Sequence, residues 1–218
     1  MTEAYRTVYR SGTGEIEEKK SRFIASVSLA ESEEEAQAFI ESVRKKYWDA
    51  RHNCWAFVTG PDHGIMRCSD DGEPQGTAGR PMLDVLTGEK LYNICVVVTR
   101  YFGGTLLGTG GLVRAYSRAV QEGLKNSLLI EKKAGRRVRV CCDYNTMGKV
   151  QYQAAQNGIA LLDTQYADTV EMVLLVPERE IDYVTKLLTE ATNARASLYV
   201  ESPVWFAAVE KEILLFDH

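Results

Sequence analysis

The chain has 218 residues, of which 45% are hydrophobic and 26% charged, and its formal net charge is −4. This composition is that of a globular protein, and the length allows one large domain or two small ones. The longest apolar stretches, such as residues 94–99, are far shorter than the roughly 20 residues of a membrane-spanning helix. The composition therefore excludes an integral helical membrane protein, and no membrane partner is expected.

The charge distribution and the cysteines indicate which partners and which cellular compartment to expect. Lys and Arg balance Asp and Glu at 18 each in residues 1–134, whereas residues 135–218 carry 8 against 12. Neither half is basic enough to coat nucleic acid nonspecifically, although a local basic groove remains open. The N-terminal residues lack a secretion-signal pattern, so we expect a cytoplasmic protein. No disulfide framework is indicated, so we interpret all five cysteines as reduced thiols: Cys54, Cys68, Cys95, Cys141 and Cys142.

The first elements along the chain are strands and an amphipathic helix. The first thirty residues are predicted to form strands: residues 15–20 are polar, and residues 23–29 alternate between apolar and polar. Ser32, with Glu35 three positions later, forms a capping box that begins a helix. A strand is then predicted over residues 54–59, with a hairpin partner over residues 65–68.

Two loops and two helices complete the first half. A polar loop over residues 69–79 leads to a short helix over 81–86, where proline fits the first turn. Residues 94–101 are strongly apolar and predict a buried strand. A glycine-rich loop over 103–111 then leads to a helix whose apolar stripe runs over 112–124.

The second half predicts a recognisable motif. The charged segment 131–135 follows a helix end and marks the expected boundary between a first domain, residues 1–134, and a second, residues 135–218. The second domain has the order β-α-β-β-α-β, which is the split motif of ferredoxin-like domains. Its strands are predicted over 137–143, 159–166, 169–176 and 197–200, and its helices over 145–156 and from residue 177. The fold class is therefore α+β.

The glycine-rich loop is the densest candidate for chemistry. Glycines allow backbone N–H groups to approach an anion closely, and a following helix N-terminus adds partial positive charge. Arg100 and Arg114 would flank such a site. The loop lacks the endings of a P-loop and of a dinucleotide fingerprint, so it is interpreted either as an anion contact or as a tight turn. Its candidate glycines are Gly103, Gly104, Gly108, Gly110 and Gly111.

The polar loop before it carries three carboxylates within four residues: Asp70, Asp71 and Glu73. Carboxylate oxygens can bind Mg²⁺ or serve as a general acid and base. Loops rich in Asp and Gly are more often solvated turns, although this one is long for a mere connection. We call residues 69–79 the acidic loop, and we expect it to line one polar cleft together with the glycine-rich loop.

Two further patterns carry weaker signals. His52 and His63 with Cys54 and Cys68 have the chemistry of zinc ligands, but their spacing fits no compact zinc motif. A Cys–His nucleophile pair would lack an orienting third group. We therefore predict no metal site, no catalytic residue and no cofactor.

Basic and aromatic residues on the early strand offer a binding surface instead. Lys20, Arg22 and Phe23, together with Tyr101 and Phe102, could form a surface for base stacking and phosphate contact. Aromatic residues on strands are more often core residues, so both interpretations stay open.

Ordered motifs within residues 20–118 resemble a known family. They are Lys20-Ser21-Arg22-Phe23-Ile24, His52-Asn53-Cys54-Trp55-Ala56, the whole of residues 69–79, and residues 99–104 through 110–116. Together they resemble the IMPACT family, in particular its bacterial YigZ-type members. The C-terminal half is similar only in pattern and length.

The resemblance implies a fold for each domain. The N-terminal domain would be an α/β sandwich like the second domain of a small-subunit ribosomal protein, a fold shared with elongation factor G and with GHMP-type small-molecule kinases. The C-terminal domain would be ferredoxin-like. Eukaryotic relatives regulate translation by binding the activator of an initiation-factor kinase, but they carry an extra domain not expected here. That partner is not carried over, and the family implies no catalytic residues.

Three functions follow as hypotheses. The leading one is a noncatalytic, RNA- or ribosome-associated regulator of translation that binds through a groove in the N-terminal domain. An alternative is an enzyme acting on a phosphorylated small molecule or nucleotide, although Leu112 and Val113 stand where GHMP-type loops have serines. The third is a protein-interaction module with a partner in translation. The groove of the leading hypothesis would use Lys20, Arg22, Arg80, Arg100 and Arg114.

Overall fold

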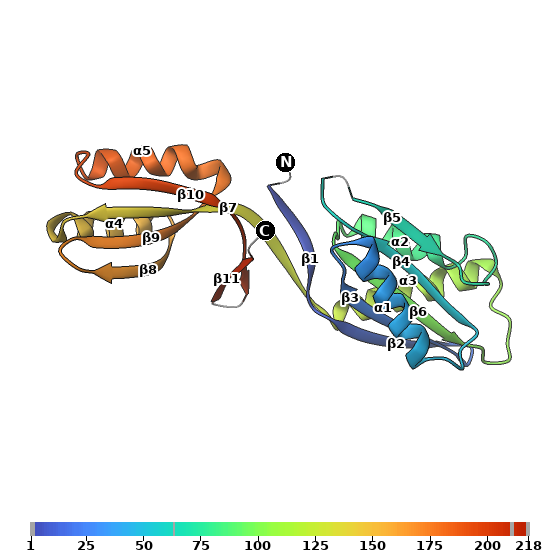
Figure 1. The fold of residues 1–218 in the computed structure, drawn as a ribbon. Helices are drawn as coiled ribbons and strands as arrows, with labels where there is room; N and C mark the ends of the chain where they lie inside the picture. The colour runs from blue at the N-terminus through green and yellow to red at the C-terminus, as the bar shows by residue number, and fades with distance from the viewer. Residues whose placement is uncertain (1–2, 63, 210–211, 217–218) are drawn as a thin grey trace. The chain divides into compact units, whose positions relative to one another are not determined.

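The computed structural model describes residues 3–62, 64–209 and 212–216. His63, considered above as a zinc ligand, lies outside the described residues. The chain divides into two compact units, Met1–Glu131 and Lys132–His218 (Figure 1). Within the described ranges, no helix is long and apolar enough to cross a membrane.

The first unit is built on a five-stranded antiparallel sheet with the order β2-β3-β6-β4-β5. The predicted strands are confirmed, including β5 as the hairpin partner of β4. The turn between β2 and β3 places Lys19 and Lys20 at φ of 47° and 66°, which matches a two-residue hairpin turn. The strands are β2 (Gly12–Glu18), β3 (Ser21–Leu29), β4 (His52–Val58), β5 (Met66–Ser69) and β6 (Ile94–Tyr101).

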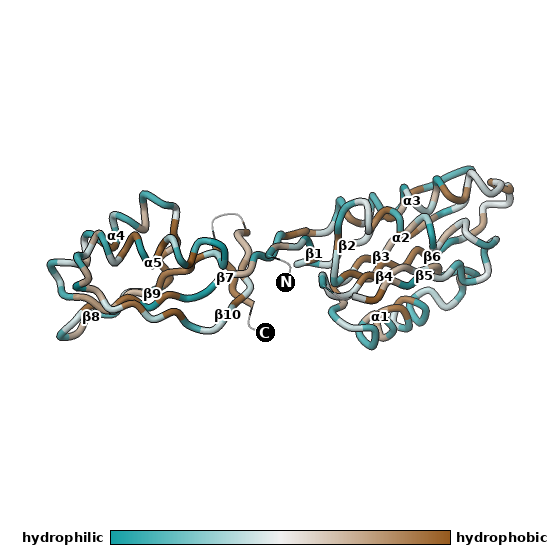
Figure 2. Tube along the Cα trace, turned by 90° about the horizontal axis from the view of Figure 1, so that it is seen from above, coloured by the Kyte–Doolittle hydropathy of each residue, from teal (hydrophilic) through white to brown (hydrophobic). Residues whose placement is uncertain are grey.

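Helices cover both faces of this sheet. Figure 2 shows α1 (Glu33–Lys46) on one side, and α2 (Gly79–Gly88) and α3 (Thr109–Lys125) on the other. Phe57 and Val97 pack in the cluster with α1, whereas Phe23 and Val98 pack in the cluster with α2 and α3. Because both faces are covered, the central strand β6 is buried over nearly its whole length.

The capping box of α1 is confirmed in one of its two bonds. Ser32 Oγ accepts the Glu35 N–H at 3.2 Å, but the Glu35 carboxylate accepts the N–H of Glu31 at 2.8 Å rather than that of Ser32. Acidic residues occupy the first turn and basic residues the last, which complements the helix dipole. The N-terminus of α1 is therefore satisfied by side chains from its own sequence.

The second unit confirms the ferredoxin-like prediction. Its core strands lie in the order β10-β7-β9-β8, so the first strand is central and the fourth lies beside it. All of their pairings are antiparallel. The elements are β7 (Leu128–Cys142), α4 (Tyr144–Gln156), β8 (Ala160–Tyr166), β9 (Val170–Pro177), α5 (Ile181–Ala191) and β10 (Ser197–Val209), and a 3-10 turn, η1 (Glu178–Glu180), precedes α5.

Of the two outermost strands, the N-terminal one lies within the first thirty residues, where strands were expected, and the C-terminal one was not predicted from the sequence. β1 (Ala4–Arg10) pairs with β7, and β11 (Glu212–Phe216) pairs with β10. Residues 131–135, expected to mark a boundary, belong to the long strand β7. The α+β fold class is confirmed.

Replacement of the Ser32 cap should destabilise the first unit. We expect Ser32→Ala to lower its free energy of opening by about 1 kcal/mol, because the Glu35 N–H loses its acceptor. Hydrogen exchange of the β6 amides measures this unit by itself. Ser42→Ala, in the interior of the same helix, is the matched control and should be close to neutral. Equal losses in the two variants would contradict the assignment of the cap.

Candidate functional site

A buried ion pair connects β6 to the acidic loop, residues 69–79. Arg100 Nη1 donates to Glu73 Oε1 at 2.6 Å, and the two side chains are only 8% and 3% exposed. The same carboxylate oxygen accepts the hydroxyl of Tyr116, from α3, at 2.8 Å. Removal of charges from water is costly unless they are paired and hydrogen-bonded. Glu73 therefore has two donors from two different elements.

Cys54 extends this buried network. Its thiol donates to the Asp70 carbonyl at 2.9 Å and lies 3.3 Å from the Tyr116 hydroxyl. Burial raises the pKa of Cys54 and, more strongly, that of Tyr116. Both groups therefore remain protonated donors at neutral pH, and Cys54 lacks the thiolate character that a nucleophile needs.

The carboxylates of the acidic loop bind their own surroundings. Asp70 accepts three backbone N–H bonds, from Gly76, Ala78 and Gly79, at 2.8 to 3.0 Å. Asp71 accepts the Asn53 N–H at 2.7 Å and a bond from Arg44 at 2.9 Å. Each acidic side chain thus has a structural partner, and the loop is an ordered element rather than a solvated turn. Among the described residues, no group of three or more His, Cys, Asp or Glu side chains is placed to hold a metal ion.

Gly103 sets the course of the glycine loop. Its N–H donates to Ser21 Oγ at 3.0 Å, and a Cβ there would lie 2.0 Å from the Lys20 carbonyl carbon. Only glycine can approach the β2–β3 turn this closely. This contact fixes the backbone directly after Phe102, so the aromatic side chain leaves the end of β6 in a defined direction.

The remaining candidate glycines lie further along the loop. Gly104 and Gly108 have φ of 84° and 70°, and Gly110 and Gly111 lie in the first turn of α3. Arg114, which is exposed, reaches back to this turn, because a Cβ on Gly110 would lie 3.7 Å from its Nη1. The glycines and Arg114 are not among the residues that line the pocket described next.

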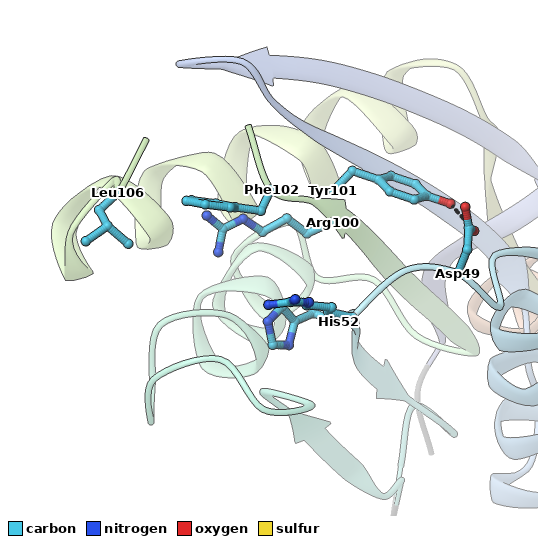
Figure 3. Close-up of a pocket in the computed structure, with 7 residues that line it drawn as sticks. Asp49, His52, Arg100, Tyr101, Phe102 and Leu106 are labelled. Atoms are coloured by element: carbon cyan, nitrogen blue, oxygen red, sulfur yellow. Dashed lines mark hydrogen bonds between the residues drawn. The ribbon is translucent and has the colours of Figure 1, made fainter. Parts of the chain in front are cut away.

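A pocket of about 650 Å³ opens beside Arg100 (Figure 3). One wall comes from the turn before β4 and its first residue, and the other from the end of β6 and the loop after it. Phe102 and Leu106 are 54% and 83% exposed, so the second wall presents apolar side chains beside the polar groups of Arg100 and Tyr101. The lining residues are Asp49, Arg51, His52, Arg100, Tyr101, Phe102 and Leu106.

The polar groups of the pocket are held in place by specific bonds. The Tyr101 hydroxyl donates to Asp49 at 2.7 Å, and this bond raises the pKa of Tyr101. His52 Nδ1 lies 2.9 Å from the Asp71 carbonyl oxygen, so the acidic loop supports the imidazole from behind. The guanidinium carbon of Arg100 lies 5.5 Å from the centre of the Phe102 ring and 5.4 Å from that of Phe23, within the range of cation–π attraction.

The other predicted basic residues lie apart from this pocket. Arg22 pairs with Glu15 at 2.7 Å, which raises the arginine's pKa, and Arg80 pairs with Asp84 at 2.8 Å. Lys20 is exposed in the β2–β3 turn. None of the three lines the pocket. Sequence reasoning missed Arg51, which lies directly before the His52 motif and lines the pocket, because a single arginine before a strand forms no pattern that indicates a site.

The comparisons with known proteins agree with this architecture. Residues 19–124 match the Impact N-terminal domain, and residues 140–195 match a domain of unknown function, DUF1949. IMPACT family member YvyE of Bacillus subtilis (strain 168) is 42% identical over 198 residues, covering 91% of both chains. The chain belongs to the IMPACT family. The family member YigZ of Escherichia coli (strain K12) is 37% identical over 186 residues, covering 84% of this chain and 91% of YigZ.

A solved structure supports the same assignment. The crystal structure of a hypothetical protein is 34% identical to this IMPACT family chain, with a TM-score of 0.60. The match covers 93% of this chain and 99% of the other. The two-domain arrangement of an Impact N-terminal domain and a ferredoxin-like domain is thus shared with a solved relative.

Breaking the buried ion pair should destabilise the first unit strongly. Glu73→Ala leaves the Arg100 guanidinium buried without its counter-charge, so we expect a loss of about 3–5 kcal/mol in the opening free energy. The double variant Glu73→Ala/Arg100→Met removes both charges and should lose less than either Glu73→Ala or Arg100→Met alone. A double-mutant cycle, followed by hydrogen exchange of the β6 amides, measures this coupling. Simple additivity of the two losses would show that the pair does not act as a unit.

Asp70 should give the protein part of its acid sensitivity. Burial raises the pKa of Asp70, but its three backbone N–H bonds more than offset this and hold the pKa below its ordinary value. A carboxylate whose pKa is lower in the folded state than in the unfolded state stabilises the fold when the pH is above the unfolded-state pKa. This contribution is lost as the pH falls through the folded-state pKa. We expect Asp70→Asn to cost about 1 kcal/mol at pH 7 and progressively less below about pH 4.

Denaturant unfolding of the wild type and Asp70→Asn at pH 7, 5 and 3 tests this dependence. Asp84→Asn is the matched control, because Asp84 lies on α2 in an exposed pair with Arg80, and such pairs contribute little. A loss in Asp70→Asn that stays constant across the pH series would count against the bonds to the carboxylate.

Proposed function

We propose that this IMPACT family chain is a noncatalytic, RNA- or ribosome-associated regulator of translation that binds through the pocket beside Arg100. One observation carries the proposal. The exposed ring of Phe102 and the cationic side chains of Arg51 and Arg100 converge on a single pocket. Proteins that bind single-stranded nucleic acid combine aromatic surfaces for base stacking with cations for the phosphates.

The charge distribution indicates that RNA binding would depend on local contacts rather than on long-range attraction. The whole chain carries −4, so long-range attraction to nucleic acid is weak. Positive charge has to act locally, from Arg51 in the pocket and from exposed side chains outside it. Lys20 and Arg114 are exposed, and we include them in the proposed binding surface. Arg22 and Arg80 contribute less, because Glu15 and Asp84 already neutralise them.

The enzyme alternative has no comparable support. It requires Asp70, Asp71 or Glu73 to hold Mg²⁺ or act as a base beside a phosphate. Instead, their oxygens accept bonds from backbone N–H groups, Arg44, Arg100 and Tyr116. These carboxylates shape the pocket from behind, so the binding proposal is the one that the geometry favours.

Titration of the full chain with 3′-labelled single-stranded RNA, followed by fluorescence anisotropy, tests the proposal. We expect saturable binding that weakens as salt is raised from low to physiological concentration. Phe102→Ala should weaken it by roughly tenfold or more, because a stacked base loses its partner. Arg51→Gln should also reduce the salt slope by about 0.7, the value for one phosphate contact on a single strand.

Matched controls separate pocket effects from general ones. Tyr152→Ala removes an aromatic side chain of similar exposure from α4. Arg118→Gln removes an exposed arginine from α3 that pairs with Glu18 instead of lining the pocket. Neither should change the affinity more than twofold. Absence of RNA binding even at low salt would overturn the proposed function.

A further inference from the structure

Arg100 has hydrogen-bond donors that the protein does not use. Its guanidinium carries five N–H groups, and its one hydrogen bond to the described residues runs from Nη1 to Glu73. Nε is buried and has no acceptor among the described residues. The Arg100 side chain is only 8% exposed. Because buried donors are nearly always satisfied, an unpaired Nε beside a pocket indicates a missing acceptor.

The unused donors lie on one edge of the guanidinium. Nε and Nη2 form the side-on fork that binds two oxygens of a carboxylate or phosphate in parallel. Arg22 uses this edge in the same protein, since its Nε and Nη2 donate to the two oxygens of Glu15 at 2.7 and 3.1 Å. The corresponding edge of Arg100 is unoccupied within the described residues, while Glu73 and Tyr116 hold the other side of the group in place.

His52 adds a ring nitrogen, Nε2, and the hydrogen bond of Nδ1 determines which of the two nitrogens carries the proton in the neutral ring. A carbonyl oxygen can only accept, so the bond of 2.9 Å to the Asp71 carbonyl places a proton on Nδ1. Nε2 is then an acceptor in the neutral ring and becomes a donor only in the imidazolium form. The charged groups around it are Arg51, Arg100 and Asp49 in the pocket and Asp71 and Glu73 in the supporting loop.

We propose that the pocket is a receptor for a phosphate monoester, held on the free Nε–Nη2 edge of Arg100 with Arg51 and His52 completing the contacts. Three nitrogen-bearing side chains match the three terminal oxygens of a monoester, whereas a phosphodiester within a chain offers only two. A volume of about 650 Å³ is that of a site for one small ligand. It accommodates one terminal nucleotide, whose base lies against Phe102, rather than a run of nucleotides.

Two sources can supply this group: the 5′-phosphate of an RNA and a free nucleoside monophosphate. The RNA source rests on the proposed function, whereas the phosphate site itself does not. The test therefore compares the full chain with three probes: an RNA octamer bearing a 5′-phosphate, the same octamer with a 5′-hydroxyl, and adenosine monophosphate. Anisotropy of the 3′-labelled octamers and calorimetry of the nucleotide give the affinities, and inorganic phosphate serves as competitor.

We expect the 5′-phosphorylated octamer to bind about tenfold more tightly than the hydroxyl form, and inorganic phosphate to remove this difference. Arg100→Lys keeps the charge but loses the fork, so it should abolish the preference. Since Arg100 is buried, exchange of the β6 amides checks that this variant is folded. Arg51→Gln, an exposed position, should reduce the preference independently, and Arg118→Gln should leave it intact.

Each outcome separates the two proposals. Equal binding of the two octamers would overturn the monoester site and leave RNA binding standing. Binding of adenosine monophosphate that Arg51→Gln weakens, without binding of either octamer, would overturn the RNA proposal and support the site. If no probe binds, both proposals fail.

Discussion

The ion pair between Arg100 and Glu73 brings together segments that are distant in the sequence. Arg100 lies near the end of the buried strand β6, Glu73 lies in the acidic loop, and Arg100 and Tyr116 of α3 donate to the same Glu73 oxygen. A buried pair pays a large desolvation cost and contributes specificity more than net stability. Here the pair fixes one arrangement of strand, loop and helix, because any other would leave a charge buried alone.

That arrangement determines the walls of the pocket. The acidic loop folds around Asp70, whose carboxylate collects three backbone N–H groups. The loop thereby presents the Asp71 carbonyl to His52 on one wall. On the other wall, the close approach of Gly103 to Lys20 fixes the chain after Phe102. The carboxylates of the acidic loop therefore support the pocket, and its lining comes from the residues on either side.

Local pattern predicted most of the fold, and long-range pairing explains what it missed. β6 and α3 follow from an apolar run and a helical stripe, and the β-α-β-β-α-β order of the second unit gave its topology. β11 was missed, and the partner of β1 was not predicted, because these strands pair with β10 and β7, and no local signal indicates such pairings. The sequence left the acidic loop open between a solvated turn and a metal or acid–base site, because its partners Arg44, Asn53 and Arg100 lie 18 to 27 positions away.

The neutralisation of Arg100 by Glu73 has a consequence for recognition. A guanidinium whose charge is compensated exerts little long-range attraction, but its free N–H groups keep their direction. In a chain of net charge −4, such a site does not gather polyanions from solution as a basic patch does. The proposed phosphate site distinguishes ligands by the number and the geometry of the oxygens that contact it. The buried pair of Arg100 and Glu73 therefore favours a site that selects a terminal phosphate. It does not favour a site whose affinity increases with the length of the nucleic acid.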